Sequence, residues 1–379
     1  MHQKRLDTLS ALVFSALRGS DLTVTSLGRF LDEATSQKHN IKRADRLLSN
    51  KLLQSELLEL YRSVNKCILK SIKSPIIHVD WSDIDEGQKF FLLRATTALE
   101  GRAVTVYEEV HGIETKEKRI THAKFLEKLK KVLPEHSQAI IVTDAGFRGP
   151  WFGAVEELGW DWIGRVRNRE LIKLKTQGNW QGVVDLHPLA NKTPKDLGSA
   201  LLTQSAPLEC RIVLYKAKPK GRVKKTKFGK KARTKKSLKN ASAQKAPWLL
   251  ATSLKNISAK NIIKTYALRM QIEESFRELK SARFGFGFEY SGTRSVSRFN
   301  ILVLIGSLAT LFAYLIGVAS FSLNLHTKFQ VNTKTKTRVL SYVFLGIRVL
   351  RSRYSQFTRK IFEQTWSWIH LTLAKYALN

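Results

Sequence analysis

The run from Phe299 to Thr327 contains no Asp, Glu, Lys or Arg, and it constrains the fold more than any other part of the chain. It is longer than the roughly 20 apolar residues that a helix needs to cross a bilayer. A helix that is apolar on every side can equally lie at the centre of a large domain. The run includes polar residues such as Ser307 and Asn324, and basic residues flank both of its ends, so the charge asymmetry of a membrane span is missing. We therefore expect a buried core helix and no membrane association, with a single membrane span as the alternative.

The charge balance points to an acidic partner. The 65 Lys and Arg residues outnumber the 31 Asp and Glu residues, which gives a net charge of +34. A charge of this size favours binding to nucleic acid or to another anionic surface. The only cysteines, Cys67 and Cys210, have no Cys or His at ligand spacing, so we expect neither a disulfide scaffold nor a zinc finger. No apolar segment typical of a secretory signal follows the basic start, and we expect a protein of the cytoplasm.

Residues 1–72 are predicted to form a helical DNA-binding region. Two short helical segments, Leu22–Leu31 and Asn40–Leu48, flank a polar run, as in a helix-turn-helix. In the second segment Ile41, Ala44 and Leu48 recur at helical spacing and can pack inward. Another face carries basic residues that can touch phosphate, namely Lys38, Lys42, Arg43 and Arg46. A solvated basic face on a small helical bundle is the alternative.

From Pro75 onward the chain changes to strand-like segments. Residues 76–80, 89–99 and 102–110 have strand character, and a Glu100-Gly101 turn separates the last two, as in an antiparallel hairpin. A helix over Thr121–Val132, a strand over 139–144, a short helix over Val155–Leu158 and a strand over 161–167 follow. This order predicts an α/β fold with a ribonuclease H-like core, in which three antiparallel strands are joined to parallel crossover units.

A largely β insertion is expected over residues 171–256. It has short strand-like pieces around a basic loop, residues 216–239, in which 13 Lys or Arg residues occur without any acid. Such a block cannot fold alone, because its charges repel one another and it has little apolar surface to bury. It is either a flexible loop or an arm that contacts nucleic-acid backbone. The core is then expected in two parts, 73–170 and 257–327, followed by a helical C-terminal region over 328–379.

Two aspartates end predicted strands of this core. Asp80 follows one apolar strand and Asp144 follows another, and neighbouring strands would bring the two carboxylates to one rim of the sheet. Carboxylates held close together repel each other unless a cation neutralises them, and Mg²⁺ prefers such oxygen ligands. Asp83 and Asp85 are further candidates, but Asp83 is expected in the connecting loop. Either aspartate alone is also a common turn or helix-cap residue.

A third acidic residue belongs to a four-residue pattern. Tyr266, Arg269, Glu273 and Lys280 are spaced by three, four and seven residues, which predicts that they share one face of a single helix. Such a face presents one metal ligand with phosphate-binding donors on either side of it. The alternative is a surface helix with salt bridges, to which Glu274 and Glu278 are expected to belong.

This pattern, Tyr-x2-Arg-x3-Glu-x6-Lys, resembles the signature of the DDE transposases of insertion-sequence family four. VDWSDI around Asp80 and VTDAGF around Asp144 are similar to the first two acidic motifs of that family, and the resemblance extends over nearly the whole chain. It implies a ribonuclease H-like core with a β insertion between Asp144 and Glu273. It also implies an N-terminal region that binds the terminal inverted repeats of the element.

The resemblance implies cut-and-paste transposition as the activity. Asp80, Asp144 and Glu273 would hold two Mg²⁺ ions, for which Mn²⁺ can substitute, and the site would carry out in-line phosphoryl transfer. In the family a nick frees a 3′-hydroxyl, a hairpin forms and is reopened, and the 3′ end attacks target DNA. Tyr266, Arg269 and Lys280 would position phosphates.

Trp248 stands where related transposases have a tryptophan that stacks on a flipped base, although a core tryptophan in a strand is the alternative. The implied partners are double-stranded DNA, as element ends and as target, and a second copy of the chain in a synaptic complex. The C-terminal region is expected to dimerise or to contact DNA, and the implied location is the bacterial cytoplasm, at the nucleoid. A catalytically inactive DNA-binding relative and a generic ribonuclease H-like nuclease are the alternative functions.

Overall fold

The structure is a computed structural model that describes residues 1–19, 21–32, 34–85, 87–167, 170–217, 230, 233–234, 246–281, 285–331, 333, 337–352 and 357–378. The predicted basic loop, 216–239, lies outside these ranges apart from residues 216–217, 230 and 233–234. The chain divides into two compact units. The larger unit contains Met1–Ala139 and Arg269–Ala377, and the smaller unit contains Ile140–Leu268.

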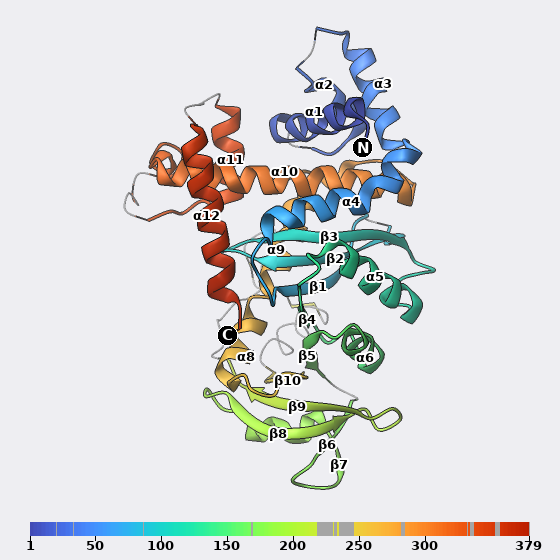
Figure 1. The fold of residues 1–379 in the computed structure, drawn as a ribbon, viewed down its shortest axis with the longest axis vertical. Helices are drawn as coiled ribbons and strands as arrows, with labels where there is room; N and C mark the ends of the chain where they lie inside the picture. Colours follow the sequence, from blue (N-terminus) through green and yellow to red (C-terminus); the bar gives the residue numbers. More distant parts are fainter. Residues whose placement is uncertain are drawn as a thin grey trace. The chain divides into compact units, whose positions relative to one another are not determined.

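Three antiparallel strands form the sheet of the larger unit (Figure 1). They lie in the order β3 (Ala103–Gly112), β2 (Phe90–Ala98), β1 (Ile76–Asp83). Central strand β2 is buried almost throughout, because strands and helices cover it on both sides. The expected hairpin is confirmed, and Gly101 in its turn has a φ of +73°, a conformation that glycine adopts without strain. Helix α5 (Arg119–Val132) follows and buries Phe125 and Leu129, as the helical spacing predicts.

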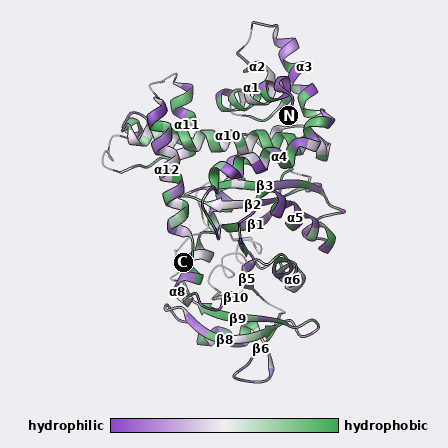
Figure 2. Cartoon of the chain, viewed as in Figure 1, coloured by the Kyte–Doolittle hydropathy of each residue, from purple (hydrophilic) through white to green (hydrophobic). Residues whose placement is uncertain are grey.

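The uncharged run forms α10 (Val296–Ser322), the central helix of the larger unit. Figure 2 shows apolar residues along its whole length, and Figure 1 shows it between α1 (Gln3–Gly19) and β3. The helix is long and apolar enough to cross a membrane, but 83% of its most apolar window is buried inside the protein. Close packing explains its glycine at position 317, where a Cβ atom would lie 1.8 Å from the carbonyl oxygen of Tyr342 on α11 (Tyr342–Arg351). The helix therefore has the environment expected of a domain core.

Four helices form the N-terminal part of the larger unit. After α1 come α2 (Val24–Arg29), α3 (Gln37–Leu48) and α4 (Lys51–Ile68). Helices α2 and α3 cross closely at Gly28, where a Cβ atom would lie 2.4 Å from the Cα atom of Ile41. Ala44 and Leu48 are buried as predicted, so α3 packs through the expected face. The C-terminal helix α12 (Arg359–Tyr376) completes the unit, with short 3₁₀ turns at Phe288–Tyr290 and Leu325–Lys328.

The described residues of the smaller unit include seven strands. Their order is β4 (Ile140–Thr143), β5 (Asp161–Val166), β10 (Trp248–Thr252), β9 (Leu208–Tyr215), β8 (Lys195–Leu202), β6 (Leu171–Leu174), β7 (Trp180–Gly182). Strands β4 and β5 are parallel and are joined by α6 (Gly149–Glu157), which is longer than the helix expected at Val155–Leu158. The other pairs are antiparallel. The unit also contains a 3₁₀ helix at Val183–Leu189 and ends with α8 (Ala259–Ala267).

Candidate active site

Asp80 lies within β1 and not at its end. The strand continues to Asp83 because Ser82 and Asp83 still pair with Leu92 and Phe91 of β2, so the expected strand end was wrong by three residues. Residues of a strand point alternately to its two faces. Asp80 and Ser82 accordingly accept hydrogen bonds on one face, from Arg269 and Lys280, whereas Trp81 donates from Nε1 to His122 of α5 at 3.1 Å on the other face.

Asp80 and Glu273 are joined by the guanidinium group of Arg269. Arg269 donates from Nη1 to Oδ2 of Asp80 at 2.9 Å and from Nη2 to Oε1 of Glu273 at 2.7 Å. Asp80 and Arg269 are largely enclosed, with 14% and 11% of their side chains exposed, while 47% of the Glu273 side chain is exposed. The second oxygen of Asp80, Oδ1, accepts from the backbone N–H of Trp81 at 2.8 Å. Two of the three predicted carboxylates therefore converge on one cationic group, which we call the Arg269 clamp.

The expected single helix is two helices. Tyr266 belongs to α8, whereas Glu273 and Lys280 belong to α9 (Met270–Lys280), which begins after Arg269. The backbone hydrogen bonds at this point span three residues instead of the four of an α-helix. The N–H of Leu268 donates to the carbonyl of Thr265, and the N–H of Ile272 donates to the carbonyl of Arg269. Leu268 and Arg269 keep right-handed helical dihedral angles, so local spacing gave no sign of the break.

Further contacts fix α9 to the sheet of the larger unit. Lys280 donates from Nζ to Oγ of Ser82 and to the carbonyl oxygen of Asp83, both at 3.1 Å. Glu274 pairs with Arg277 at the surface, as expected. Glu278 does not: its side chain is 4% exposed and pairs with Arg102. Burial raises the pKa of Glu278, and the Arg102 guanidinium opposes that shift, so the expectation that Glu278 forms a surface salt bridge was wrong.

Trp248 and Tyr266 lie together in the smaller unit. Trp248 is the first residue of β10 and is half-buried, and its ring meets the ring of Tyr266 edge-on, with centroids 5.1 Å apart. Tyr215 of β9 contacts Trp248 from another direction, with centroids 6.0 Å apart. Tyr266 is 3% exposed, so its ring supports Trp248 from within the unit. Trp248 thus combines a packed side with a partly open one.

Asp144 directly follows β4, as predicted, and belongs to the smaller unit. Its Oδ1 atom accepts from the backbone N–H of Gly146 at 2.8 Å, which closes a tight turn before α6. Among the residues that the structure describes, no group of three His, Cys, Asp or Glu side chains could hold a metal ion. The role of Asp144 beside Asp80 and Glu273 stays a prediction.

Sequence reasoning missed the arginines beside Asp144. A groove of about 610 Å³ in the smaller unit is lined by the loop after β4 and the end of β5, with Arg148, Arg165 and Arg167 among its side chains. Arg148 lies four residues after Asp144, and Arg165 and Arg167 alternate at the end of a strand that is parallel to β4. Carboxyl ends of adjacent parallel strands lie at one edge, so this alternation was a usable signal.

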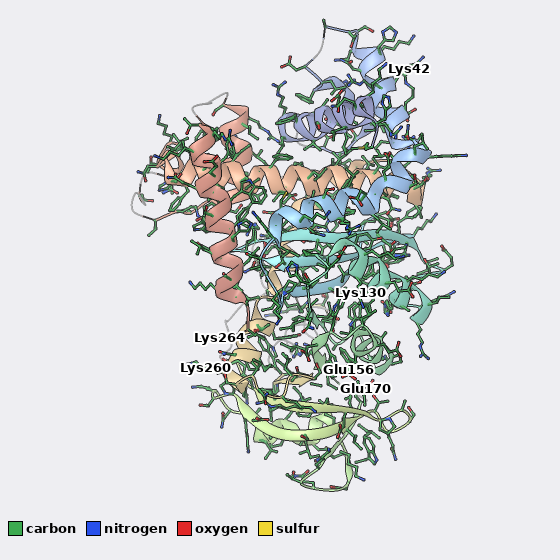
Figure 3. The ribbon with its side chains drawn as sticks, viewed as in Figure 1. Lys42, Lys130, Glu156, Glu170, Lys260 and Lys264 are labelled. Carbon is green, nitrogen blue, oxygen red and sulfur yellow. The ribbon has the colours of Figure 1, made fainter. Side chains whose placement is uncertain are left out.

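The predicted DNA contacts on α3 separate into two kinds. Lys38, Lys42 and Arg46 are exposed, and Figure 3 shows Lys42 directed away from the helices of its unit. Arg43 is half-buried and donates from Nε and Nη2 to Oγ1 of Thr8 on α1, at 3.2 and 3.1 Å. The structure therefore gives Arg43 a packing contact and leaves the other three side chains in solvent.

Comparison with known families shows which family the chain belongs to. The family described as the transposase DDE domain matches residues 72–308, which is more than half of the chain. No curated protein matches the sequence.

Proposed function

Because the chain belongs to the transposase DDE domain family, whose members are DNA-cleaving enzymes, we propose that it is the transposase of an insertion sequence of family four. It excises its element and joins it to target DNA by nicking, hairpin formation, hairpin opening and strand transfer. In this proposal the strands and helices around Asp80, Asp144 and Glu273 are a ribonuclease H-like core, and the β-rich part of the smaller unit is its insertion.

The Arg269 clamp is the observation that carries this proposal. Asp80 and Arg269 are 189 positions apart in the sequence, yet their side chains bond, and the same guanidinium bonds Glu273. Two motifs found independently in the sequence thus meet at one point of the larger unit. A salt bridge on a surface helix, such as Arg269–Glu273 alone, would involve only one of these two motifs.

The donor set of the clamp fits a divalent cation. Asp80 and Glu273 present carboxylate oxygens to one shared positive group, and such oxygens are the ligands that Mg²⁺ and Mn²⁺ prefer. We propose that Asp80, Glu273 and Asp144 hold the metal ions, with Mg²⁺ as the natural species. Bound metal supplies activation of the attacking oxygen and charge stabilisation at the leaving oxygen. With both carboxylates engaged by metal, the planar donors of Arg269 would be available for a DNA phosphate.

The remaining predicted residues serve DNA in this proposal. Lys280 presents its ammonium group beside Ser82 and Asp83 of β1, where a phosphate would approach. Trp248 stacks on a flipped base through its partly open side, while Tyr266 holds the indole ring. The exposed residues Lys38, Lys42 and Arg46 bind terminal inverted repeats, and two copies of the chain meet in the synaptic complex.

The direct test is incubation of the purified protein with a labelled element end, a target duplex and Mg²⁺. Nicked, hairpin and joined products are expected on a gel. Asp80→Ala, Asp144→Ala and Glu273→Ala should each remove all products while retaining binding, because affinity comes mostly from many phosphate contacts. Asp83→Ala is the matched control, since it removes an exposed carboxylate next to the site and retains the backbone carbonyl that binds Lys280.

The products also separate the alternatives. Cleavage without joining indicates a generic nuclease, and binding without any cleavage by the unaltered protein indicates an inactive DNA-binding relative. Substantial cleavage by any of the three carboxylate variants would refute the assignment of that residue.

A further inference from the structure

The arginine groove beside Asp144 has a positively charged lining. Its volume is about 610 Å³, and the loop from Asp144 to Gly149 forms one side. Arg148, Arg165 and Arg167 contribute three guanidinium groups, against the carboxylates of Asp144 and Glu170. The lining therefore carries one more positive than negative charge.

Among the described residues, the exposed Arg148 and the half-buried Arg167 lack the carboxylate partner that several other arginines of the protein have. Arg94, Arg102 and Arg211 each pair with a carboxylate. Within the described part of the chain, Arg148 and Arg167 form no ion pair, and Nε of Arg167 is buried without a hydrogen-bond partner. A buried guanidinium donor without an acceptor costs free energy, and a bound anion would supply the acceptor.

The acidic residues of the groove are already engaged. Oδ1 of Asp144 accepts from the N–H of Gly146, and Oε2 of Glu170 accepts from Oγ1 of Thr203 at 2.9 Å. Arg165 is held by the carbonyl oxygen of Pro247, to which its Nη2 donates at 3.4 Å. Arg148 and Arg167 therefore have the least engaged guanidinium groups among the described residues of this groove.

We propose that the groove is a phosphodiester-binding subsite in which Arg148 and Arg167 together hold one backbone phosphate of DNA. A phosphodiester carries a single negative charge and two exposed oxygens, which match two guanidinium forks. The subsite rests on the proposed function, because it uses the DNA substrate and lies directly beside Asp144. It sets the register of a DNA strand relative to that carboxylate without reading its bases.

Methylphosphonate scanning tests the subsite. Phosphates of an element-end duplex and of a target duplex are replaced one at a time by neutral methylphosphonates, and affinity is measured for the unaltered protein and for Arg148→Ala/Arg167→Ala. At one phosphate the unaltered protein should lose affinity by roughly tenfold or more, as expected for hydrogen bonds to a charged group. For the double variant, the methylphosphonate at that position should cause no further loss of affinity. The duplex in which that position occurs identifies which DNA occupies the groove.

Matched variants keep the result interpretable. Lys260→Ala/Lys264→Ala removes two exposed positive charges from α8 of the same unit. These lysines lie away from Glu170 of the groove in Figure 3, so this variant should retain the full sensitivity to the methylphosphonate. Arg148→Lys/Arg167→Lys keeps both charges and should retain part of it, which covers the case in which the alanine variant does not fold.

If no phosphate in either duplex shows this coupling, the subsite is wrong although the proposed function stands. The same holds if the lysine-to-alanine control loses sensitivity equally. If the unaltered protein binds neither duplex, the proposed function fails and the subsite fails with it.

Discussion

The buried ion pair between Arg94 on β2 and Glu108 on β3 lies behind the helix that carries Glu273. Nε of Arg94 donates to Oε2 of Glu108 at 2.6 Å, and the two side chains are 3% and 0% exposed. Tyr61 and Ser307 donate to the other carboxylate oxygen, at 3.0 and 2.5 Å. Arg94 also donates from Nη1 to the carbonyl and hydroxyl oxygens of Ser275 on α9, both at 3.3 Å. The Arg94–Glu108 pair therefore connects two strands to α4, α9 and α10.

Glu108→Gln removes the negative charge and leaves Arg94 buried beside a neutral amide. Removing one partner of a buried ion pair typically costs about 3–5 kcal/mol. We expect about 3 kcal/mol, because glutamine keeps the volume and one acceptor oxygen, and Arg94 keeps Ser275 and the Phe276 ring, 5.3 Å from its guanidinium carbon. For a domain of roughly this size each kcal/mol lowers Tm by about 2–4 °C, so Tm should fall by roughly 6–12 °C.

Thermal unfolding followed by tryptophan fluorescence measures this change, and hydrogen exchange of Met270–Lys280 reports whether α9 loosens with it. Glu135→Gln is the matched control. Glu135 also pairs with an arginine, Arg62, but its side chain is 90% exposed. Exposed pairs contribute at most about 1 kcal/mol, so Tm of this variant should change little.

The double variant Arg94→Met/Glu108→Gln decides whether the charge pair itself is responsible. It leaves no unpaired buried charge, so its loss of stability should be smaller than the sum for Arg94→Met and Glu108→Gln. The reasoning fails if the stability losses of the two single variants simply add in the double variant. It also fails if Glu108→Gln has the same Tm as the exposed control Glu135→Gln, because the ion pair then does not stabilise the larger unit.

Three further predictions concern single side chains. Arg269→Gln should tighten Mn²⁺ binding, measured by electron paramagnetic resonance without DNA, because Arg269 competes for the oxygens of Asp80 and Glu273; unchanged affinity would contradict the clamp. Trp248→Ala should slow hairpin formation far more than the first nick, so nicked DNA accumulates on a gel, whereas Trp180→Ala in the same unit should keep the normal ratio; equal slowing of both steps would remove the stacking role. Burial lowers the pKa of His122 from 6.5 to about 4, so the stability that depends on its neutral form is complete above about pH 6.5 and is lost as the pH falls towards 4. The Tm of His122→Gln should therefore depend less on pH over that range than the Tm of the unaltered protein. An identical pH profile would refute this cause.

Local patterns predicted the elements whose causes are local. The hairpin at Gly101 depends on a glycine in a left-handed conformation and on strand-forming residues beside it, and both are visible in the sequence. Helix α5 depends on the spacing of Phe125 and Leu129. The uncharged run is apolar on every side and therefore needs apolar surroundings. The larger unit supplies them around α10.

The expectations that were wrong depended on contacts between distant segments. Strand β1 continues beyond Asp80 because β2 continues to pair with it, and the length of a pairing partner cannot be read from the strand itself. The break before α9 changes only which carbonyls accept hydrogen bonds, since Leu268 and Arg269 stay in the helical region. Periodicity is blind to such a change, because the side chains keep almost the same spacing.

The supports of the candidate site show why motif spacing found Glu273 and Lys280 but not the other residues that hold their helix. Helix α9 is attached to its unit through polar side chains as well as apolar ones, because Ser275 accepts from Arg94, Glu278 pairs with Arg102 and Lys280 donates to Ser82. In the sequence Ser275 and Glu278 look like part of the solvated face of a surface helix. Arg102 and Glu278 are 176 positions apart, so nothing near either residue reveals the pair. A burial pattern can indicate that a helix packs, but only the fold assigns each buried charge its partner, and here those partners determine where Glu273 stands relative to Asp80.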